Sequence, residues 1–405
     1  MRPYRTKHSH NPLAERKGPY GPAQARVLDL AGFEAARREI TSWPGYAPTP
    51  LIPLDGLAAR AGLGRIWYKD ESRRFGLGSF KALGGAYAVY RLLAADVAKA
   101  TARPSVAASE LVGRTHRKIT EAVTVCCATD GNHGRSVAWG AQSFGCNCVI
   151  YISTFVSEGR KRAMEAYDAK VVRIDGNYDD SVREAAVQAA RQGWFVISDT
   201  SYEGYTAIPR DVMQGYVVMA DEAIEQLPAN ERPSHIFVQG GVGGLAAAVL
   251  ARFWQLDGAG RPRFVVVEPE AAACIYASLS AGKPVAVGGS LETVMAGLSA
   301  GEVSILAWEL LKPGVDDVMT VEDAAASELM RLLARGEGPD PPIVAGESGV
   351  AGLAGALAAC ADPDLSAAFG LDERASILVF GTEGATDPEV YREIVGRAPE
   401  EVAPA

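Results

Sequence analysis

The sequence predicts an α/β protein with two doubly wound parallel-sheet domains, and three observations support this class. Short apolar stretches alternate with stretches of helical pattern through most of the 405 residues. Such alternation is typical of a parallel sheet covered by helices on both faces. The chain is too long for one simple core. Its 48% hydrophobic and 22% charged residues are ordinary for a globular protein.

The predicted elements fall into two series. In the first we expect strands at 123–128, 147–153, 170–174 and 194–198, and helices at 135–144, 159–167 and 181–192. A helix over 212–226, broken by Pro228, connects it to the second. There we expect strands at 235–239, 263–268 and 375–380, and a helix at 244–254.

These series predict a large domain of residues 1–84 and 226–405 and a small domain of residues 85–225. The first 84 residues are grouped with the second series because 48–51 and 66–69 have the pattern of edge strands. Residues 99–116 are expected to form a surface excursion, 1–21 a mobile arm and 397–405 a frayed tail.

Composition excludes several classes of protein. A net charge of −9 provides no basic field for nucleic acid. No apolar run is long enough to cross a bilayer, and the basic N-terminus lacks the apolar stretch of a secretory signal. The six cysteines have neither zinc nor redox spacing. They indicate buried reduced thiols and a cytoplasmic protein. The histidines at 8–10 are too terminal to predict a metal site.

The first candidate site is the stretch RFGLGSFKALGGAYAV, residues 74–89. Ser79 can cap a helix whose first turn holds Lys81, and Phe80 and Leu83 suggest a buried start. Burial and the positive end of a helix disfavour the ammonium form, which leaves an amine for Schiff-base chemistry. Taken alone, the stretch also fits a surface lysine on an Ala-rich helix.

The second candidate is VQGGVGGLAAAV, residues 238–249, a glycine-rich turn between a strand and a helix. Successive amides at a helix start can bind one phosphate. The glycine spacing is too compact for a dinucleotide fingerprint, and a nucleotide P-loop would need a Gly-Lys-Ser/Thr. A tight turn alone is the alternative.

The third candidate is ATDGNHGRS, residues 128–136, at the end of a predicted strand. Asn132 lies at the carboxyl end of that strand, where doubly wound sheets bind ligands. His133 is interpreted as a packed or capping residue. Asp130 is unusual in a turn otherwise rich in glycine. A reactive lysine, a phosphate-binding turn and a strand-end asparagine together suggest pyridoxal 5′-phosphate.

Over residues 45–390 the chain resembles the fold-type II pyridoxal-phosphate enzymes, the tryptophan synthase β and threonine dehydratase superfamily. SFKALGG, GNHG and GGVGGL occur in the order typical of that superfamily. Within it the chain is similar to the diaminopropionate ammonia-lyase family. That likeness depends on KDESRRFGLGSFKALGGAYA, ATDGNHGRSVAWGA, DTSYEGYTAIPRDVMQGY, TVMAGL, AGESG and GTEGATDP.

The resemblance implies roles for the candidate residues toward the cofactor. Lys81 would form the covalent imine, and Asn132 would meet the phenolic oxygen. Thr382 would place a neutral hydroxyl beside the pyridine nitrogen, which suits elimination. The phosphate would be held by the amides of Gly240, Gly241, Val242, Gly243 and Gly244.

The same resemblance implies a role for the carboxylates. Asp130 would deprotonate D-2,3-diaminopropionate and Lys81 the L form, although a helix cap or an Asp-Gly turn would also explain Asp130. Asp199 would hold a substrate ammonium or cap a helix. Glu347 would face the pocket or serve only a turn.

The expected activity is elimination of L- and D-2,3-diaminopropionate to pyruvate and two ammonia, by a homodimer as is common among relatives. A serine or threonine dehydratase, or a racemase of the same fold, is the alternative enzyme. A non-catalytic sensor that binds a phosphorylated metabolite through GGVGGL is the alternative of another class.

Overall fold

The computed structural model describes residues 4–402, and the chain forms two compact units. Unit 1 is built from Met1–Asp29, Pro48–Ser79 and Met219–Ala405. Unit 2 is built from Leu30–Ala47 and Phe80–Val218. Each unit has its own sheet, and each contains some of the candidate residues.

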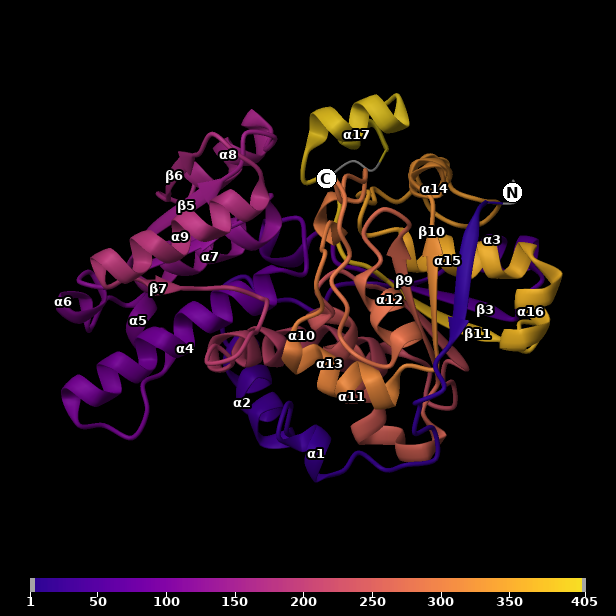
Figure 1. Cartoon of the computed structure of the whole chain (residues 1–405), viewed down its shortest axis with the longest axis horizontal. Coiled ribbons are helices and arrows are strands. Elements are labelled where there is room, and N and C mark those ends of the chain that lie inside the picture. The colour runs from indigo at the N-terminus through magenta and orange to yellow at the C-terminus, as the bar shows by residue number, and fades with distance from the viewer. Residues whose placement is uncertain (1–3, 403–405) are drawn as a thin grey trace. The chain divides into compact units, whose positions relative to one another are not determined.

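Unit 1 contains a seven-stranded sheet of order β1-β10-β9-β8-β11-β3-β2 (Figure 1). The inner neighbours pair in parallel, and the edge strands β1 and β2 are antiparallel. The apolar inner strands are buried on both faces, as expected for parallel strands. The strands are β1 (Thr6–His10), β2 (Leu51–Pro53), β3 (Arg65–Asp70), β8 (His235–Gln239), β9 (Arg263–Pro269), β10 (Asp317–Val321) and β11 (Ser376–Gly381).

Helices cover this sheet, and α15 (Ala351–Ala361) is buried along nearly its whole length. Its glycines permit the close approach: a Cβ at Gly352 would lie 2.6 Å from the Phe237 oxygen, and one at Gly355 2.6 Å from Val267. The other helices of unit 1 are α1 (Pro22–Ala25), α3 (Asp55–Ala61), α11 (Gly244–Asp257), α12 (Cys274–Ala281), α13 (Ile305–Gly314), α14 (Asp323–Arg335), α16 (Pro363–Phe369), α17 (Pro388–Val395) and α18 (Pro399–Val402).

Unit 2 contains a four-stranded parallel sheet of order β6-β5-β4-β7. Its strands are β4 (Thr124–Ala128), β5 (Asn147–Ile152), β6 (Lys170–Arg173) and β7 (Phe195–Val196). Its helices are α2 (Leu30–Ile40), α4 (Ala82–Thr101), α5 (Ala108–Val112), α6 (Arg117–Thr120), α7 (Asn132–Phe144), α8 (Glu158–Glu165) and α9 (Tyr178–Gln192). The helix α10 (Ala207–Gln226) begins in unit 2 and ends in unit 1.

Small residues let α4 and α7 pack closely in unit 2. A Cβ at Gly140 would lie 2.7 Å from the Cα of Ala86. The Ser136 hydroxyl also donates a hydrogen bond of 2.6 Å to the backbone oxygen of Lys81. The glycines and the serine of these motifs therefore fix the start of α4 against α7.

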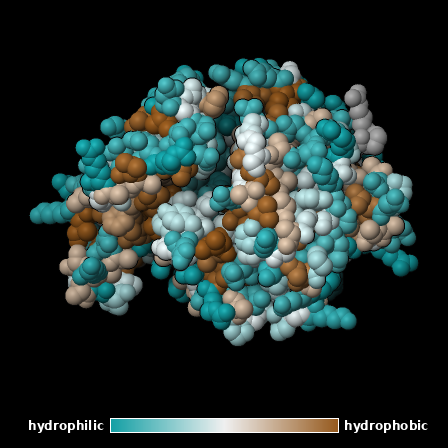
Figure 2. Space-filling model, viewed as in Figure 1, coloured by the Kyte–Doolittle hydropathy of each residue, from teal (hydrophilic) through white to brown (hydrophobic). Residues whose placement is uncertain are grey.

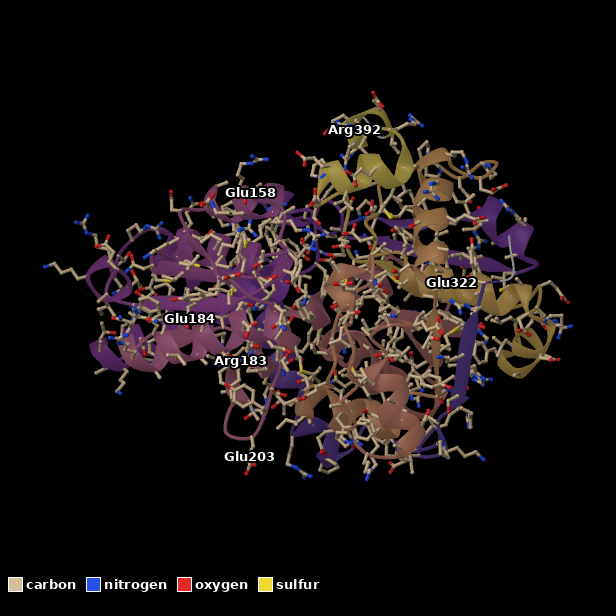
Figure 3. The ribbon with its side chains drawn as sticks, turned by 45° about the horizontal axis from the view of Figure 1, so that its top comes forward. Glu158, Arg183, Glu184, Glu203, Glu322 and Arg392 are labelled. Atoms are coloured by element: carbon tan, nitrogen blue, oxygen red, sulfur yellow. The ribbon has the colours of Figure 1, made fainter. Side chains whose placement is uncertain are left out.

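The predicted α/β class with parallel sheets is confirmed, and two terminal predictions are wrong. Residues 6–10, expected to be mobile, form β1, which pairs with β10 (indigo beside orange in Figure 1). Arg5 precedes this strand and lies 3.5 Å from Glu322, which is labelled beside the strand in Figure 3. The tail is helical over Pro399–Val402; its last residues, 403–405, lie outside the described part.

The compact units differ in detail from the predicted domains. Residues 30–47 and 80–84 belong to unit 2, whereas the sequence grouped them with the large domain. The predicted excursion at 99–116 contains the end of α4 and all of α5. The domain boundaries at 84/85 and 225/226 stay a prediction.

Hydrophilic residues cover much of the face shown in Figure 2, with hydrophobic residues in scattered patches. Across residues 4–402, no helix combines the length and apolar character needed to span a bilayer.

Candidate active site

Lys81 forms an ion pair with Asp199 in unit 2. Lys81 is the N-cap residue immediately before α4, so it precedes the first turn in which the sequence placed it. Asp199 lies in the loop after β7, and its carboxylate accepts a short hydrogen bond from the Lys81 amine. The two side chains are only 18% and 17% exposed.

This pairing reverses the expected charge preference of Lys81. Burial disfavours the ammonium, but the Asp199 carboxylate outweighs burial and raises the pKa of Lys81 above its usual value. Burial likewise opposes ionisation of Asp199, yet Lys81 lowers the pKa of that carboxyl. The lysine is therefore held as an ammonium where the sequence predicted an available amine.

Two aromatic rings lie beside the Lys81 amine. The Nζ atom is 5.4 Å from the centroid of Phe80 and 5.6 Å from that of Tyr216. The two ring centroids are 4.6 Å apart. Both distances from Nζ are within the range of cation–π attraction.

Asp130 is not the cap of α7. The Thr129 hydroxyl takes that role, accepting hydrogen bonds from the amides of Gly131 at 3.0 Å and Gly134 at 3.1 Å. Within the described residues, no backbone amide donates to the Asp130 carboxylate. Burial raises the pKa of Asp130 to about 6, with the nearby Arg160 opposing the shift. The capping alternative for Asp130 therefore has no support.

The Tyr178 hydroxyl lies within electrostatic range of both Asp130 and Asp199. Although 40% of its surface is exposed, the surroundings of its hydroxyl raise its pKa, first by burial and then through Asp199 and Asp130. Both carboxylates thus lie in one region of unit 2.

Asn132 and His133 begin α7, as the strand-end position predicted. Asn132 is partly buried. The His133 Nε2 lies 2.8 Å from the Ile197 carbonyl oxygen, so this nitrogen carries the proton. Burial lowers the pKa of His133, which keeps the ring neutral. The structure therefore places His133 as a packed residue.

The glycine-rich turn lies in unit 1, between β8 and α11. Gly243 has φ +94°, a left-handed conformation that favours glycine. The Gly240 amide donates to the Val267 oxygen at 2.8 Å and is used by the sheet. Among the described residues, no protein acceptor binds the amides of Gly241, Val242, Gly243 and Gly244. These amides can bind an anion at the start of a 14-residue helix.

Thr382 follows β11 in unit 1 and is 2% exposed. The Gln239 amide donates to the Phe380 oxygen at 2.9 Å and to the Thr382 hydroxyl oxygen at 2.6 Å. Because the carbonyl requires a donor, the amide orientation is fixed. The Thr382 proton is therefore available to an acceptor such as a neutral ring nitrogen.

Glu347 is 3% exposed in a segment packed against the loop that holds Thr382. The Gly346 amide donates to the Glu383 oxygen at 2.9 Å, and that of Ser348 to the Glu383 carboxylate at 2.8 Å. The motifs GESG and GTEG thus lie side by side within unit 1.

Sequence reasoning missed Tyr216, Tyr178 and Gln239, and it named Phe80 only as an apolar neighbour of Lys81. A signal for Tyr216 was present, because Gly84 and Gly215 both lie in helix interiors, where glycine is unfavourable without a packing reason. A Cβ at Gly215 would clash with the Leu83 oxygen, and one at Gly84 would clash with the Tyr216 ring. Tyr178 and Gln239 gave no comparable signal.

A family model, "Pyridoxal-phosphate dependent enzyme", matches residues 42–370. The chain belongs to this family of pyridoxal-phosphate dependent enzymes.

Among its relatives is the diaminopropionate ammonia-lyase of Escherichia coli K12, 42% identical over 371 residues, which cover 89% of this chain and 90% of that protein. The solved holo structure of the E. coli lyase matches with a TM-score of 0.88 and 37% identity, covering 97% of each chain. Its complex with D-serine also matches with a TM-score of 0.88, 37% identity and 97% of each chain.

The residues present fit pyridoxal phosphate. Four unpaired amides from Gly241 to Gly244 suit its phosphate, and the Thr382 hydroxyl suits a neutral ring nitrogen. Lys81 supplies the amine that a Schiff base needs. The chain therefore carries donors and a nucleophile that match the parts of this cofactor.

Proposed function

We propose that this chain is a diaminopropionate ammonia-lyase, which converts 2,3-diaminopropionate and one water into pyruvate and two ammonia. The 42% identity to the E. coli lyase over nearly the whole chain supports this activity. The observation that carries it is the Asp130 carboxylate, which is partly buried, has a raised pKa and does not cap its helix. A serine or threonine dehydratase has no need of a second carboxylate beside Asp199.

The cofactor-binding residues are assigned as follows. Lys81 would hold the cofactor covalently through its aldehyde, and Asn132 would meet its phenolic oxygen. The Thr382 hydroxyl donates to the ring nitrogen. The phosphate is bound by the glycine-rich turn, Gly240, Gly241, Val242, Gly243 and Gly244, and the free amides after Gly240 supply its hydrogen bonds.

Bound pyridoxal phosphate acidifies the Cα proton of an amino acid joined to it. Lys81 would accept that proton from the L form. Asp130 accepts it from the D form, and a pKa of about 6 suits a base that must be ionised near neutral pH. The β-amino group leaves as ammonia.

The carboxylates also account for the choice of substrate. Diaminopropionate carries two amino groups where serine carries one amine and a hydroxyl, so the site must bind an additional cation. We assign Asp199 to that binding once Lys81 has left it, with Asp130 nearby. Glu347 is buried beside the loop of Thr382, and we assign it to substrate binding.

Turnover of four substrates tests the proposal. Ammonia release should be fastest with L- and D-2,3-diaminopropionate and slower with serine and threonine. Faster turnover of serine would replace the proposal with the dehydratase. The D-serine complex of the E. coli lyase makes D-serine the most informative competitor.

The variant Asp130→Asn tests whether Asp130 is needed for the D substrate and not for the L substrate. Because Asn cannot accept the proton, kcat for the D substrate should fall by about 10²- to 10⁴-fold. Turnover of the L substrate should stay within about threefold of the original, since Lys81 is untouched. Equal losses for both would reduce Asp130 to a structural role.

We also propose a cytoplasmic location and a homodimeric state. All six cysteines are free thiols, which supports a reducing compartment. The dimer is supported by the family resemblance, and light scattering of the purified protein tests it.

A further inference from the structure

The Tyr216 side chain is fully buried with an unpartnered hydroxyl. The residue is 1% exposed, and within the described residues no group meets its hydroxyl in full hydrogen-bond geometry, although Lys81 lies near enough to influence its pKa. A buried hydroxyl without a partner destabilises the fold, so it indicates an interaction still to be made. Burial raises the pKa of Tyr216, which keeps the phenol neutral.

The surroundings of Tyr216 indicate that its hydroxyl can interact with the Lys81 amine. Its ring lies 5.6 Å from the Lys81 Nζ atom and 4.6 Å from the centroid of Phe80. An ammonium has three donors, of which Asp199 receives one. A phenol oxygen beside that ammonium can accept another.

The close approach of this ring depends on Gly84. A Cβ there would lie 2.8 Å from the Tyr216 Cζ and 2.8 Å from Val212, so any larger residue would displace the ring. Gly84 lies in α4, one turn after Lys81. The glycine therefore forms a slot for the Tyr216 ring beside the reactive lysine.

We propose that Tyr216 is a positioning residue for Lys81. With Phe80 it holds the amine beside Asp199 whenever Lys81 is not joined to the cofactor, and Gly84 makes the space for it. The inference rests on the proposed role of Lys81. Among the described residues, the titratable groups that face the amine include Asp199, Tyr216 and His133, whose neutral ring adds no charge.

The test measures the reactivity of Lys81 in the full chain stripped of cofactor. Tyr216→Phe keeps the ring and removes the hydroxyl. Tyr87→Phe is the matched control, because Tyr87 is a buried tyrosine on α4, and among the described residues Lys81 is not one of the groups that shift its pKa. Acetic anhydride and a bulky sulfosuccinimidyl ester modify the amine at pH 8, and peptide mass spectrometry follows Lys81.

Loss of the hydroxyl should increase the neutral fraction of Lys81, so both reagents should react about three- to tenfold faster in Tyr216→Phe. The Tyr87→Phe rates should equal those of the unchanged protein. Rates unaffected by Tyr216→Phe would overturn the proposal. So would a selective gain for the bulky ester, because that pattern reports an opened pocket.

Two additional measurements complete the test. In the Gly84→Ala variant, both reagents should modify Lys81 faster than in the unchanged protein. If this variant does not fold, the Tyr216→Phe result alone tests the proposal. In the holoenzyme, Tyr216→Phe should shift the pH profile of L-substrate turnover to lower pH and leave the D-substrate profile unchanged. The modification of Lys81 in the cofactor-free protein needs no substrate. It can therefore be interpreted even if the proposed lyase activity is not found.

Discussion

Lys69 and Lys81 are both shielded from solvent, yet their surroundings differ. Lys69, in β3 of unit 1, is 0% exposed, and its amine donates to three acceptors. These are the Thr49 oxygen at 2.6 Å, the Glu222 carboxylate at 2.8 Å and the Gln226 side chain at 2.9 Å. All three donors of its ammonium are used.

Lys81 in unit 2 pairs with one carboxylate and lies beside two aromatic rings. Burial lowers the pKa of Lys69, whereas Asp199 raises that of Lys81. A criterion based on pKa alone would choose Lys69 as the reactive amine. If Lys81 is the reactive amine as proposed, hydrogen-bond saturation is the better criterion, because the three acceptors of Lys69 already use every donor of its ammonium.

The surroundings of Lys69 also have a structural role. Arg74 donates to both oxygens of Glu71 and both oxygens of Glu222, at 2.6–2.8 Å. Thr49, Arg74 and Glu222 lie close in sequence to 47/48, 79/80 and 218/219, where the chain passes between units. One buried ionic cluster in unit 1 thus anchors three connecting segments.

The largest expected effect is the loss of Lys81. Lys81→Ala should reduce ammonia production by about 10⁴-fold, because both the covalent attachment and a general base disappear. Borohydride reduction of the holoenzyme, followed by peptide mapping, should place the pyridoxyl group on Lys81 and leave Lys69 unmodified. An adduct on Lys69 would break the comparison between the two lysines.

Removal of one charge from the cluster around Lys69 comes next. Glu222→Gln leaves Lys69 and Arg74 with Glu71 as their remaining buried carboxylate, so the free energy of unfolding should fall by about 3–5 kcal/mol. Urea unfolding with an unchanged m-value measures it. The exposed Lys161–Glu165 pair provides the control, and Glu165→Gln should cost at most about 0.5 kcal/mol. Similar losses for the two variants would contradict the structural role of the cluster.

The smallest effect is a gain in stability. Burial raises the folded-state pKa of Asp130 from 3.8 to about 6, so the ionised carboxylate destabilises the fold above that pH. Asp130→Asn should therefore raise the free energy of unfolding by about 1–2 kcal/mol at pH 8. The gain should shrink as the pH falls through 6 and disappear only below 3.8, where the carboxyl is protonated in both the folded and the unfolded state. Thermal unfolding at both pH values checks it, and a loss of stability at pH 8 would contradict the assigned surroundings.

The sequence predicted the parts of the fold that follow local pattern. The inner strands of both sheets are apolar and end at glycine or polar turns, so β4, β5, β8 and β9 were located nearly to the residue. β1, with the sequence TKHSH, was missed because a polar edge strand has no such pattern. Its place depends on β10, which lies more than 300 residues further along the chain.

The sequence motifs identified the candidate residues but could not predict how their side chains pair. Lys81 and Asp199 are 118 residues apart, and no local pattern joins them. The sequence therefore predicted a lowered pKa for Lys81, whereas Asp199 raises this pKa in the structure. The cap supplied by Thr129 was also hidden, because Asp130 is equally suited to that role by composition.

The position of β11 determines when this protein can fold during synthesis. This strand, Ser376–Gly381, lies between β8 and β3 and joins the N-terminal pair β2–β3 to the rest of its sheet. During synthesis, β2 and β3 cannot join the rest of their sheet until nearly the whole chain has been made. Phe80–Val218, by contrast, emerges as one continuous stretch that contains its own sheet. The segment that contains Lys81 can thus fold well before the segment that completes the larger sheet.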